Sequence, residues 1–304
     1  MFFKKYFLHK KIGYPILFGY IGAFILVIII ILISLKSVIN LGVSHDDSIP
    51  ESFSNINLRA RSVYVFDSKE NKILFTKNET ESLPIASITK VMTVYCSVLN
   101  NDLDKTVSVS DGVFGHIGSA TSTNIIETWS LRDLSIYTLI ESSNEGAKTL
   151  ARASGSENET LKCMNQKAAE MSLRETKFFN VTGLDLDSTH PGAVSSTENV
   201  ATLLERVYDE YPDIYSKTAN SVYKIYAKNG RIHTALNTNM VSDEIVGILA
   251  SKTGLTDLAG GNLAYVMNTG LNHKVFVAIL GSTEAGRFDD ALLINRAVLE
   301  SFVK

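Results

Sequence analysis

The sequence predicts a mixed α/β fold of the α+β type. A mostly antiparallel sheet is built from N- and C-terminal segments, flanked by helices and interrupted by an inserted helical lobe, and one N-terminal transmembrane helix precedes it. Three observations predict this fold: strand patterns near both ends of the globular part, helical patterns between them, and a long uncharged apolar run near the start. Hairpin signals and short connections favour antiparallel pairing, because parallel strands need long crossovers.

The uncharged apolar segment Tyr14–Leu35 is long enough to cross a bilayer core as a helix. Lysines precede the segment and acidic residues follow it, which predicts a cytoplasmic N-terminus and an extracytoplasmic remainder. A cleaved signal peptide is the alternative, but the run exceeds the usual signal-peptide core and no A-x-A-like site closes it. We expect a single-pass protein of the cell membrane. Its predicted parts are a basic tail (1–13), a signal-anchor (14–35), a tether (36–55) and a globular domain (56–304).

Composition argues against several classes of function. The chain has 29 Lys and Arg, 32 Asp and Glu, and a formal net charge of −3, without a basic cluster in the globular part, so no nucleic-acid partner is expected. The six histidines are scattered and no H-E-x-x-H occurs, so neither a metal site nor a cofactor is predicted. The missing G-x-S-x-G pattern argues against an ordinary α/β-hydrolase.

The two cysteines, Cys96 and Cys163, could pair in an oxidising extracytoplasmic compartment. Two separated cysteines in a core-rich domain are more often unpaired and buried. We therefore assign no disulfide from the sequence.

The N-terminal part of the globular domain begins with a hairpin. Residues 62–67 (SVYVFD) alternate as a strand does, and residues 72–78 return after a polar turn. A helix is expected after Pro84, with Ser87 in its first turn.

The middle of the chain, from about 104 to 204, is predicted to be mainly helices and loops. Residues 131–154 indicate two apolar-faced helices interrupted near 141–145. The segment SSTE at 195–198 fits a capping box for the next helix.

The C-terminal part returns to strands. Asn229-Gly230 separates two strand patterns and is a strong hairpin signal. Three strand-like runs follow, at 247–254, 261–268 and 274–282, and a helix is expected at 289–303.

Ser87 and Lys90 form the first of three polar groups that interrupt apolar patterns. Residues three apart share one face of a helix, so the hydroxyl and the amine should lie side by side. A serine hydroxyl needs a neighbouring base to act as a nucleophile, and lysine serves only where its pKa is lowered. A helix N-terminus would add backbone N–H groups suited to an oxyanion. Taken alone, S-x-x-K is also typical of a helix cap beside a solvated lysine.

The second group is ESSNE, residues 141–145. Ser142 and Asn144 either form a turn between helices or point into a cleft, where one relays a proton and the other binds an amide. The third group is SKTG, residues 251–254, at the end of an apolar strand. Lys252 and Thr253 suit a substrate carboxylate, and Gly254 allows a ligand backbone to approach closely.

Together the three groups form the series S-x-x-K, S-x-N and K-T-G, the signature of penicillin-binding proteins and β-lactamases. The chain resembles the D-alanyl-D-alanine carboxypeptidases, the low-molecular-mass penicillin-binding proteins of serine peptidase family S11. Further segments resemble landmarks of that family: 62–93, FFNVTGLD (178–185), SSTENVATL (195–203), NTN (237–239) and KTGLTDLAGGNL (252–263).

The resemblance implies a β-lactamase/DD-peptidase-like catalytic domain and a role for each residue of the series. Ser87 would attack the carbonyl between two D-alanines, Lys90 would act as the base, and Ser142 would pass the proton to the leaving amine. Asn144 would bind the substrate amide. Lys252 and Thr253, with Gly254 and Leu255 beside them, would bind the terminal carboxylate side of the substrate. The backbone N–H groups of Ser87 and Leu255 would form the oxyanion hole. The implied partners are peptidoglycan stem peptides, with β-lactams as inhibitors.

Three residues depart from the family pattern. Ser143 stands where Gly or Ala is usual, Glu145 where Asp is usual, and Ser251 precedes K-T-G where an apolar residue is common. These differences bear on substrate preference more than on mechanism.

Several alternatives share the same motifs. A class A β-lactamase would carry Ser-Asp-Asn and an E-x-x-L-N segment, and neither is found here. A peptidoglycan DD-endopeptidase would use the same residues as a carboxypeptidase. A membrane-tethered binding or sensor module with slow turnover would be favoured by a lost motif residue, and none is lost.

Overall fold

The computed structural model describes residues 49–99, 101–110, 126–270 and 273–303. The predicted signal-anchor at 14–35 lies outside the described residues. Within the described ranges, no helix combines the length and the apolar character that crossing a membrane requires. The predicted tether reaches to residue 55, whereas Phe53 is already buried and stacks on Phe75 with ring centroids 5.3 Å apart.

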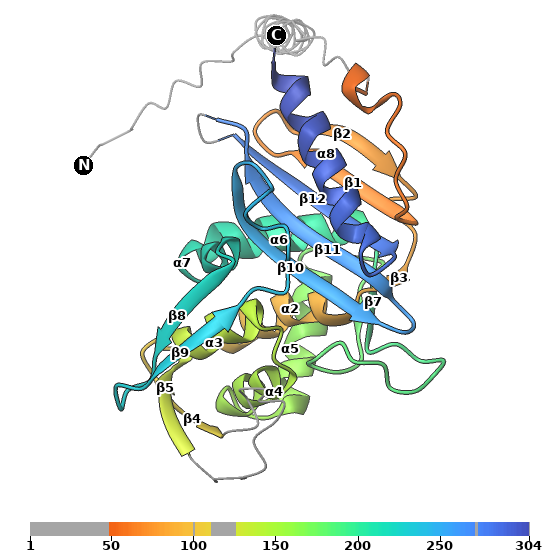
Figure 1. The fold of residues 1–304 in the computed structure, drawn as a ribbon. Coiled ribbons are helices and arrows are strands. Elements are labelled where there is room, and N and C mark those ends of the chain that lie inside the picture. The colour runs from red at the N-terminus through yellow and green to blue at the C-terminus, as the bar shows by residue number, and fades with distance from the viewer. Residues whose placement is uncertain (1–48, 100, 111–125, 271–272, 304) are drawn as a thin grey trace, which may run out of the picture. The chain divides into compact units, whose positions relative to one another are not determined.

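The described part of the chain contains strands at both ends and helices between them (Figure 1). The elements from the start to the first half of the lobe are η1 (Glu51–Phe53), β1 (Ser62–Asp67), β2 (Lys72–Lys77), β3 (Leu83–Pro84), η2 (Ala86–Ile88), α2 (Thr89–Val98), β4 (Thr106–Ser110), β5 (Ile126–Ser130), α3 (Leu131–Ile140), α4 (Asn144–Ala153) and α5 (Glu157–Glu170). The elements that follow are β6 (Lys177–Phe178), β7 (Ala193–Ser195), α6 (Thr197–Glu210), α7 (Pro212–Tyr215), η4 (Ser216–Ala219), β8 (Val222–Tyr226), β9 (Ile232–Leu236), β10 (Ile248–Thr256), β11 (Gly260–Asn268), β12 (Lys274–Ser282) and α8 (Gly286–Phe302).

The main sheet has five strands in the order β10-β11-β12-β1-β2, and every neighbouring pair is antiparallel. It therefore joins the two ends of the globular chain, as the sequence predicts. Helices α6 and α8 cover opposite faces of this sheet, and α2 to α5 form the lobe beside it (Figure 1). Strand β10 lies at an edge of the sheet, and η2 and η4 pack against it.

Alternation along the strands divides the apolar core into two layers. Val63 and Val65 of β1 belong to the layer under α8, whereas Tyr64 between them belongs to the layer shared with α2 and α6. Successive strand residues point to opposite faces, so a sheet covered on both sides needs apolar residues at consecutive positions. The central strands β11 and β12 accordingly have almost fully buried interiors.

Two local predictions differ from the structure. Helix α6 is capped by Ser196, whose side chain accepts from the Asn199 N–H, one residue later than the predicted box starting at Ser195. The region predicted as helices and loops also contains strands β4 and β5, which pair antiparallel with Val107 opposite Trp129. Both strands are five residues long, too short for alternation alone to separate them from loop.

The structure answers a question that the sequence left open, whether the two cysteines pair. Cys96 on α2 and Cys163 on α5 form a disulfide with their Cα atoms 6.1 Å apart. The nine-residue spacing from Ser87 turns Cys96 to the side of α2 away from the nucleophile, and α5 packs there: Thr93 of α2 contacts Met164, the neighbour of Cys163. The sequence could not show that α5 covers this side of α2.

We expect the disulfide to contribute about 4 kcal/mol to the free energy of unfolding, since it closes a loop of 67 residues. Urea unfolding of the wild type with and without reductant measures this contribution, and the double variant Cys96→Ala/Cys163→Ala is the control on which reductant should have no effect. Two thiols titrating in unreduced, denatured wild type would contradict the bond.

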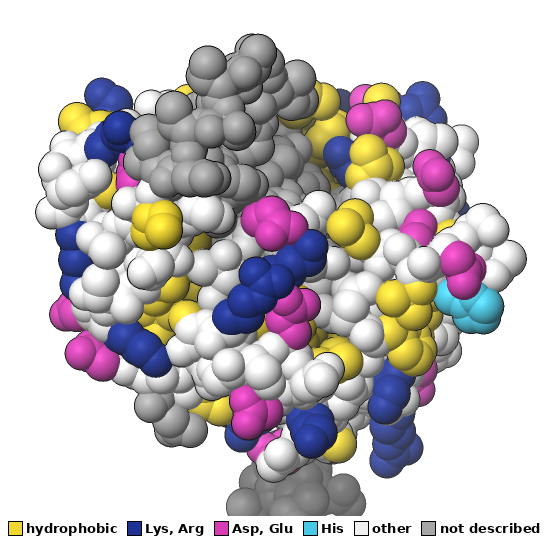
Figure 2. All heavy atoms as spheres, turned by 90° about the horizontal axis from the view of Figure 1, so that it is seen from below, with side chains coloured by type: hydrophobic (Ala, Val, Ile, Leu, Met, Phe, Trp, Pro, Cys, Tyr) yellow, Lys and Arg dark blue, Asp and Glu magenta, His cyan; other side chains and the backbone are white. Residues whose placement is uncertain are grey.

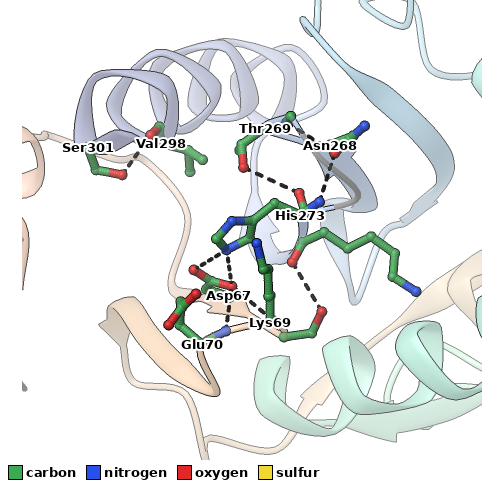
Figure 3. A network of polar contacts seen from close by, with 11 residues as sticks. Asp67, Lys69, Glu70, Asn268, Thr269, His273, Val298 and Ser301 are labelled. Atoms are coloured by element: carbon green, nitrogen blue, oxygen red, sulfur yellow. Dashed lines mark hydrogen bonds and ion pairs between the residues drawn. The ribbon is translucent and has the colours of Figure 1, made fainter. Parts of the chain in front are cut away.

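A polar network fastens the sheet at the end of β1 (Figure 3). His273, between β11 and β12, points its Nε2 at both carboxylate oxygens of Asp67, at 2.6 and 2.7 Å. Asp67 also accepts from the N–H groups of Lys69 and Glu70, and the His273 ring packs edge-on against Phe302 at the end of α8. The network ties two hairpins to the C-terminal helix.

Charges of both signs are interspersed on one face of the molecule (Figure 2). On the face seen in Figure 2, Lys and Arg side chains lie beside Asp and Glu side chains and do not gather into one basic patch.

Candidate active site

Ser87 lies in the short 3₁₀ turn η2, directly before helix α2, and not within the helix itself. The preceding residue, Ala86, has φ of +47°, a left-handed conformation that is costly for a residue with a side chain. The approach to this turn is fixed by Asn262 of β11, whose amide donates to the Pro84 carbonyl at 3.0 Å and accepts from the Gly281 N–H at 2.8 Å. Residues held in such sparsely populated backbone conformations are found most often at functional sites.

The Lys90 amine lies 2.7 Å from Ser87 Oγ, on the first turn of α2. It also donates to the Thr182 carbonyl at 2.8 Å. Lys90 is fully buried, and this burial lowers its pKa from 10.5 to about 7. A substantial neutral fraction therefore exists near neutral pH, and its lone pair can accept the Ser87 proton. This is the arrangement that the S-x-x-K spacing predicts.

The turn at residues 180–184 holds the carbonyl that Lys90 uses. Asn180 Oδ1 accepts from the N–H groups of Thr182 and Gly183, and its amide donates to the Leu184 carbonyl at 2.8 Å. Gly183 has φ of +80°, and a Cβ on it would lie 1.9 Å from the Ala86 carbonyl oxygen. The sequence identified 178–185 only as a family landmark and gave these residues no role. The sequence does contain a signal for this turn: Asn180 is followed three residues later by Gly183, and both residue types favour tight turns.

Ser142 and Lys252 lie together, although 110 residues separate them: the Lys252 amine donates to Ser142 Oγ at 2.9 Å. Ser142 has φ of +57° and occupies the break between α3 and α4, as the sequence predicts for 141–145. Burial, together with the positive charges of Lys90 and Arg287, lowers the pKa of Lys252 well below its ordinary value. A carboxylate placed beside Lys252 would raise this pKa again.

Thr253 and Gly254 continue along edge strand β10. Thr253 Oγ1 lies 2.6 Å from Thr238 Oγ1, so a second hydroxyl, which the sequence did not predict, stands beside that of the K-T-G motif. Gly254 faces the nucleophile turn: a Cβ on it would lie 2.6 Å from the Ile85 carbonyl oxygen. The glycine is therefore needed for the chain's own packing, whereas the sequence suggested room for a ligand. Leu255, the next residue, is 42% exposed.

Asn144 begins helix α4, two residues after Ser142. Its Oδ1 is buried and has no hydrogen-bond partner among the described residues. A buried acceptor without a partner is costly unless a ligand supplies the donor. The side chain is therefore suited to a substrate N–H.

The departures from the family pattern have local structural reasons. Ser143 caps α4, accepting from the Gly146 N–H at 3.0 Å, and Glu145 in the first helical turn pairs with Lys148 at 2.7 Å. Ser251 bonds to Thr218 through both its N–H and its hydroxyl, which attaches the start of β10 to η4. The three side chains stabilise the edges of the site.

The structure brings the predicted residues into two contacting pairs, Ser87 with Lys90 and Ser142 with Lys252. Thr253, Gly254 and Leu255 follow Lys252 on the strand that packs against the nucleophile turn. Among the described residues, no three His, Cys, Asp or Glu side chains are placed to hold a metal ion.

Comparison with known proteins agrees with this geometry. The sequence profile of the D-alanyl-D-alanine carboxypeptidases, peptidase family S11, matches residues 49–283. The chain is 29% identical over 238 residues to D-alanyl-D-alanine carboxypeptidase DacF of Bacillus subtilis, covering 76% of this chain and 59% of that protein. It is also 29% identical over 228 residues to a D-alanyl-D-alanine endopeptidase of Pseudomonas aeruginosa, covering 71% of this chain and 69% of that one. The chain thus spans less than two thirds of the length of DacF.

Solved structures share the fold. Penicillin-binding protein D2 from Listeria monocytogenes, in its ampicillin-bound form, matches with a TM-score of 0.67 and 26% identity, over 79% of this chain and 98% of that one. The D-alanyl-D-alanine carboxypeptidase of Mycobacterium tuberculosis matches with a TM-score of 0.69 and 20% identity, over 83% of this chain and 96% of that one. At this low identity, the match shows a shared fold and nothing more. Because the family profile covers most of the chain and the motif residues form one site, this chain belongs to the D-alanyl-D-alanine carboxypeptidase family, S11, of serine peptidases.

Proposed function

We propose that this protein is a serine-type D-Ala-D-Ala carboxypeptidase that removes the terminal D-alanine from peptidoglycan stem peptides. The observation that carries the proposal is the contact between Ser87 Oγ and a buried lysine amine whose pKa is lowered to about 7. A hydroxyl beside a neutral amine is an activated nucleophile. The family relationship supplies the substrate class.

Acylation follows from the arrangement of the first pair. Neutral Lys90 takes the proton from Ser87 as Oγ attacks the carbonyl between the two D-alanines, and its remaining N–H bond to Thr182 holds the amine in place. The oxyanion that forms is placed near the N–H groups of Ser87 and Leu255. When the tetrahedral intermediate collapses, the proton passes by way of Ser142 to the leaving amine. Water then hydrolyses the ester of Ser87 and releases the shortened peptide.

Substrate binding uses the second pair and strand β10. Lys252 is buried and donates to Ser142 Oγ and to the Thr253 carbonyl, so a substrate carboxylate would gain a charge-assisted hydrogen bond there, together with the Thr253 hydroxyl. The unpartnered Asn144 Oδ1 would accept the substrate N–H. Peptide pairing along the edge strand would orient the scissile bond.

The proposed setting is the outer face of the cell membrane. The uncharged segment Tyr14–Leu35, preceded by four lysines, would anchor the protein with its N-terminus in the cytoplasm. The disulfide is consistent with an oxidising compartment outside the cytoplasm. Attachment of a reporter enzyme that is active only outside the cytoplasm, placed after Lys304, tests this topology.

The activity is tested by D-alanine release. We expect the full-length protein to release D-alanine from an acetylated stem peptide that ends in D-Ala-D-Ala, and to leave the matched peptide that ends in D-Ala-L-Ala intact. Cleavage confined to cross-linked dimeric peptides would indicate that the protein is an endopeptidase and not a carboxypeptidase. Rapid hydrolysis of penicillin without peptide cleavage would indicate a β-lactamase, and binding without either reaction would indicate the binding module.

A further inference from the structure

Arg287, the second residue of α8, is a buried cation with a fixed contact on strand β10. It is only 6% exposed, and its Nη1 donates to the Gly254 carbonyl at 2.8 Å. The guanidinium also lies over the Phe288 ring, 4.6 Å from the centroid. Its Nε is buried without a hydrogen-bond partner among the described residues. Burying a cation with an unused donor costs free energy. We therefore ask what the contact of Arg287 with the Gly254 carbonyl does for the site.

The carbonyl that Arg287 binds belongs to the peptide unit that joins Gly254 to Leu255. The described residues contain no cis peptide bond, so the carbonyl and the N–H of this unit point in opposite directions. Arg287 takes the carbonyl, and the Leu255 N–H therefore points away from α8. The unit lies against the nucleophile turn, since a Cβ on Gly254 would meet the Ile85 carbonyl oxygen at 2.6 Å and Ala86 Cβ at 3.3 Å. Ser87 is the next residue of that turn.

A charged donor on an amide carbonyl draws electron density from the amide and makes its N–H a stronger hydrogen-bond donor. We propose that Arg287 is a positioning residue that polarises the Gly254–Leu255 peptide, so that the Leu255 N–H stabilises the oxyanion more strongly. The inference rests on the proposed function, in which Leu255 supplies one of the two oxyanion donors. It adds a residue of α8, far along the chain from all three motifs, to the machinery of the site.

The test compares full-length wild type with Arg287→Gln, which can keep a hydrogen bond but loses the charge, and with Arg287→Lys, which keeps the charge. Arg296→Gln removes an exposed charge from the same helix and is the matched control. We expect the acylation rate by benzylpenicillin to fall about tenfold in Arg287→Gln, less than the ~100-fold loss typical of removing an entire oxyanion donor. Arg287→Lys should recover part of this loss, and Arg296→Gln should match wild type.

Infrared spectroscopy of the acyl-enzyme supplies a readout that a merely structural role would not change. A weaker oxyanion hole polarises the ester carbonyl less, so its stretching band should move to higher frequency in Arg287→Gln. An unchanged band and rate in the folded variant would overturn the inference, and so would a loss of thermal stability with an unchanged band.

Two further controls separate the possible failures. If Arg287→Gln does not fold, the test uses the NMR frequency of the Leu255 amide proton in Arg287→Lys and in wild type. A lower frequency in Arg287→Lys than in wild type supports the inference, and an equal frequency overturns it. If wild type itself forms no acyl-enzyme, the proposed function fails and this inference falls with it. If wild type acylates normally and Arg287→Gln acylates at the same rate, the inference fails and the proposed function stands.

Discussion

Lys90→Met is expected to reduce acylation of Ser87 by about 1,000-fold or more, within the range of general-base contributions. The Lys90 amine lies 2.7 Å from Ser87 Oγ, and methionine keeps a similar apolar volume without the lone pair. Stopped-flow measurement of acylation by a chromogenic cephalosporin gives the rate. Lys69→Met, which removes an exposed lysine from the turn after β1, is the matched control and should acylate normally.

Lys90→Arg distinguishes a base from a positive charge. Arginine stays protonated, so it should be nearly as inactive as methionine. In wild type the base must be neutral, and the pKa of Lys90 is about 7, so acylation should rise as pH increases through 7 and then level off. The expected increase is about tenfold between about pH 6 and about pH 8. An active Lys90→Arg variant, or a rate that falls across this range, would exclude Lys90 as the base.

Gly183→Ala is expected to have the second largest effect, on both stability and acylation. The added Cβ would lie 1.9 Å from the Ala86 carbonyl oxygen and 2.6 Å from Thr89 Oγ1, so the nucleophile turn must move. Left-handed backbone strain and overpacking together should lower the free energy of unfolding by about 2–5 kcal/mol. The displacement of Ser87 should slow acylation by about 100-fold in the protein that still folds. Urea unfolding and the acylation assay measure the two effects.

Gly230→Ala is the control for backbone strain. Gly230 has φ of +85° and nothing within 4 Å of an added Cβ, so this variant should lose only about 1–2 kcal/mol and no acylation rate. Equal effects of the two alanine substitutions on acylation would show that the packing of Gly183 on the nucleophile turn is unimportant.

The sequence predicted those parts of the fold that depend on local pattern. Alternation at 62–67 and three strand-like runs near the C-terminus indicated strands of the five-stranded sheet. Asn229-Gly230 indicated the β8–β9 hairpin, and the polar residues at 141–145 indicated the break between α3 and α4. The β8–β9 hairpin forms a separate two-stranded sheet, which its own pattern did not reveal because strand partners are chosen by tertiary packing.

The sequence also pointed to the side chains that form the two contacting pairs, Ser87 with Lys90 and Ser142 with Lys252, because the motif spacing singles them out. It could not predict residues that act through backbone contacts between distant segments. The Thr182 carbonyl under Lys90 and the contact of Arg287 with Gly254 depend on how the turn at 180–184 and helix α8 pack against the motif strands. The disulfide was missed for the same reason, because its two helices meet only in the folded lobe.

Intact-mass spectrometry after brief exposure to benzylpenicillin tests the central claim, that Ser87 is a nucleophile activated within this site. Full-length wild type should gain the mass of one drug molecule, and Ser87→Ala, folded by circular dichroism, should gain none. Peptide mapping should place the adduct on Ser87, and its persistence over minutes would separate a penicillin-binding peptidase from a β-lactamase. An unmodified wild type with intact drug, or an adduct that survives in Ser87→Ala, would contradict the account.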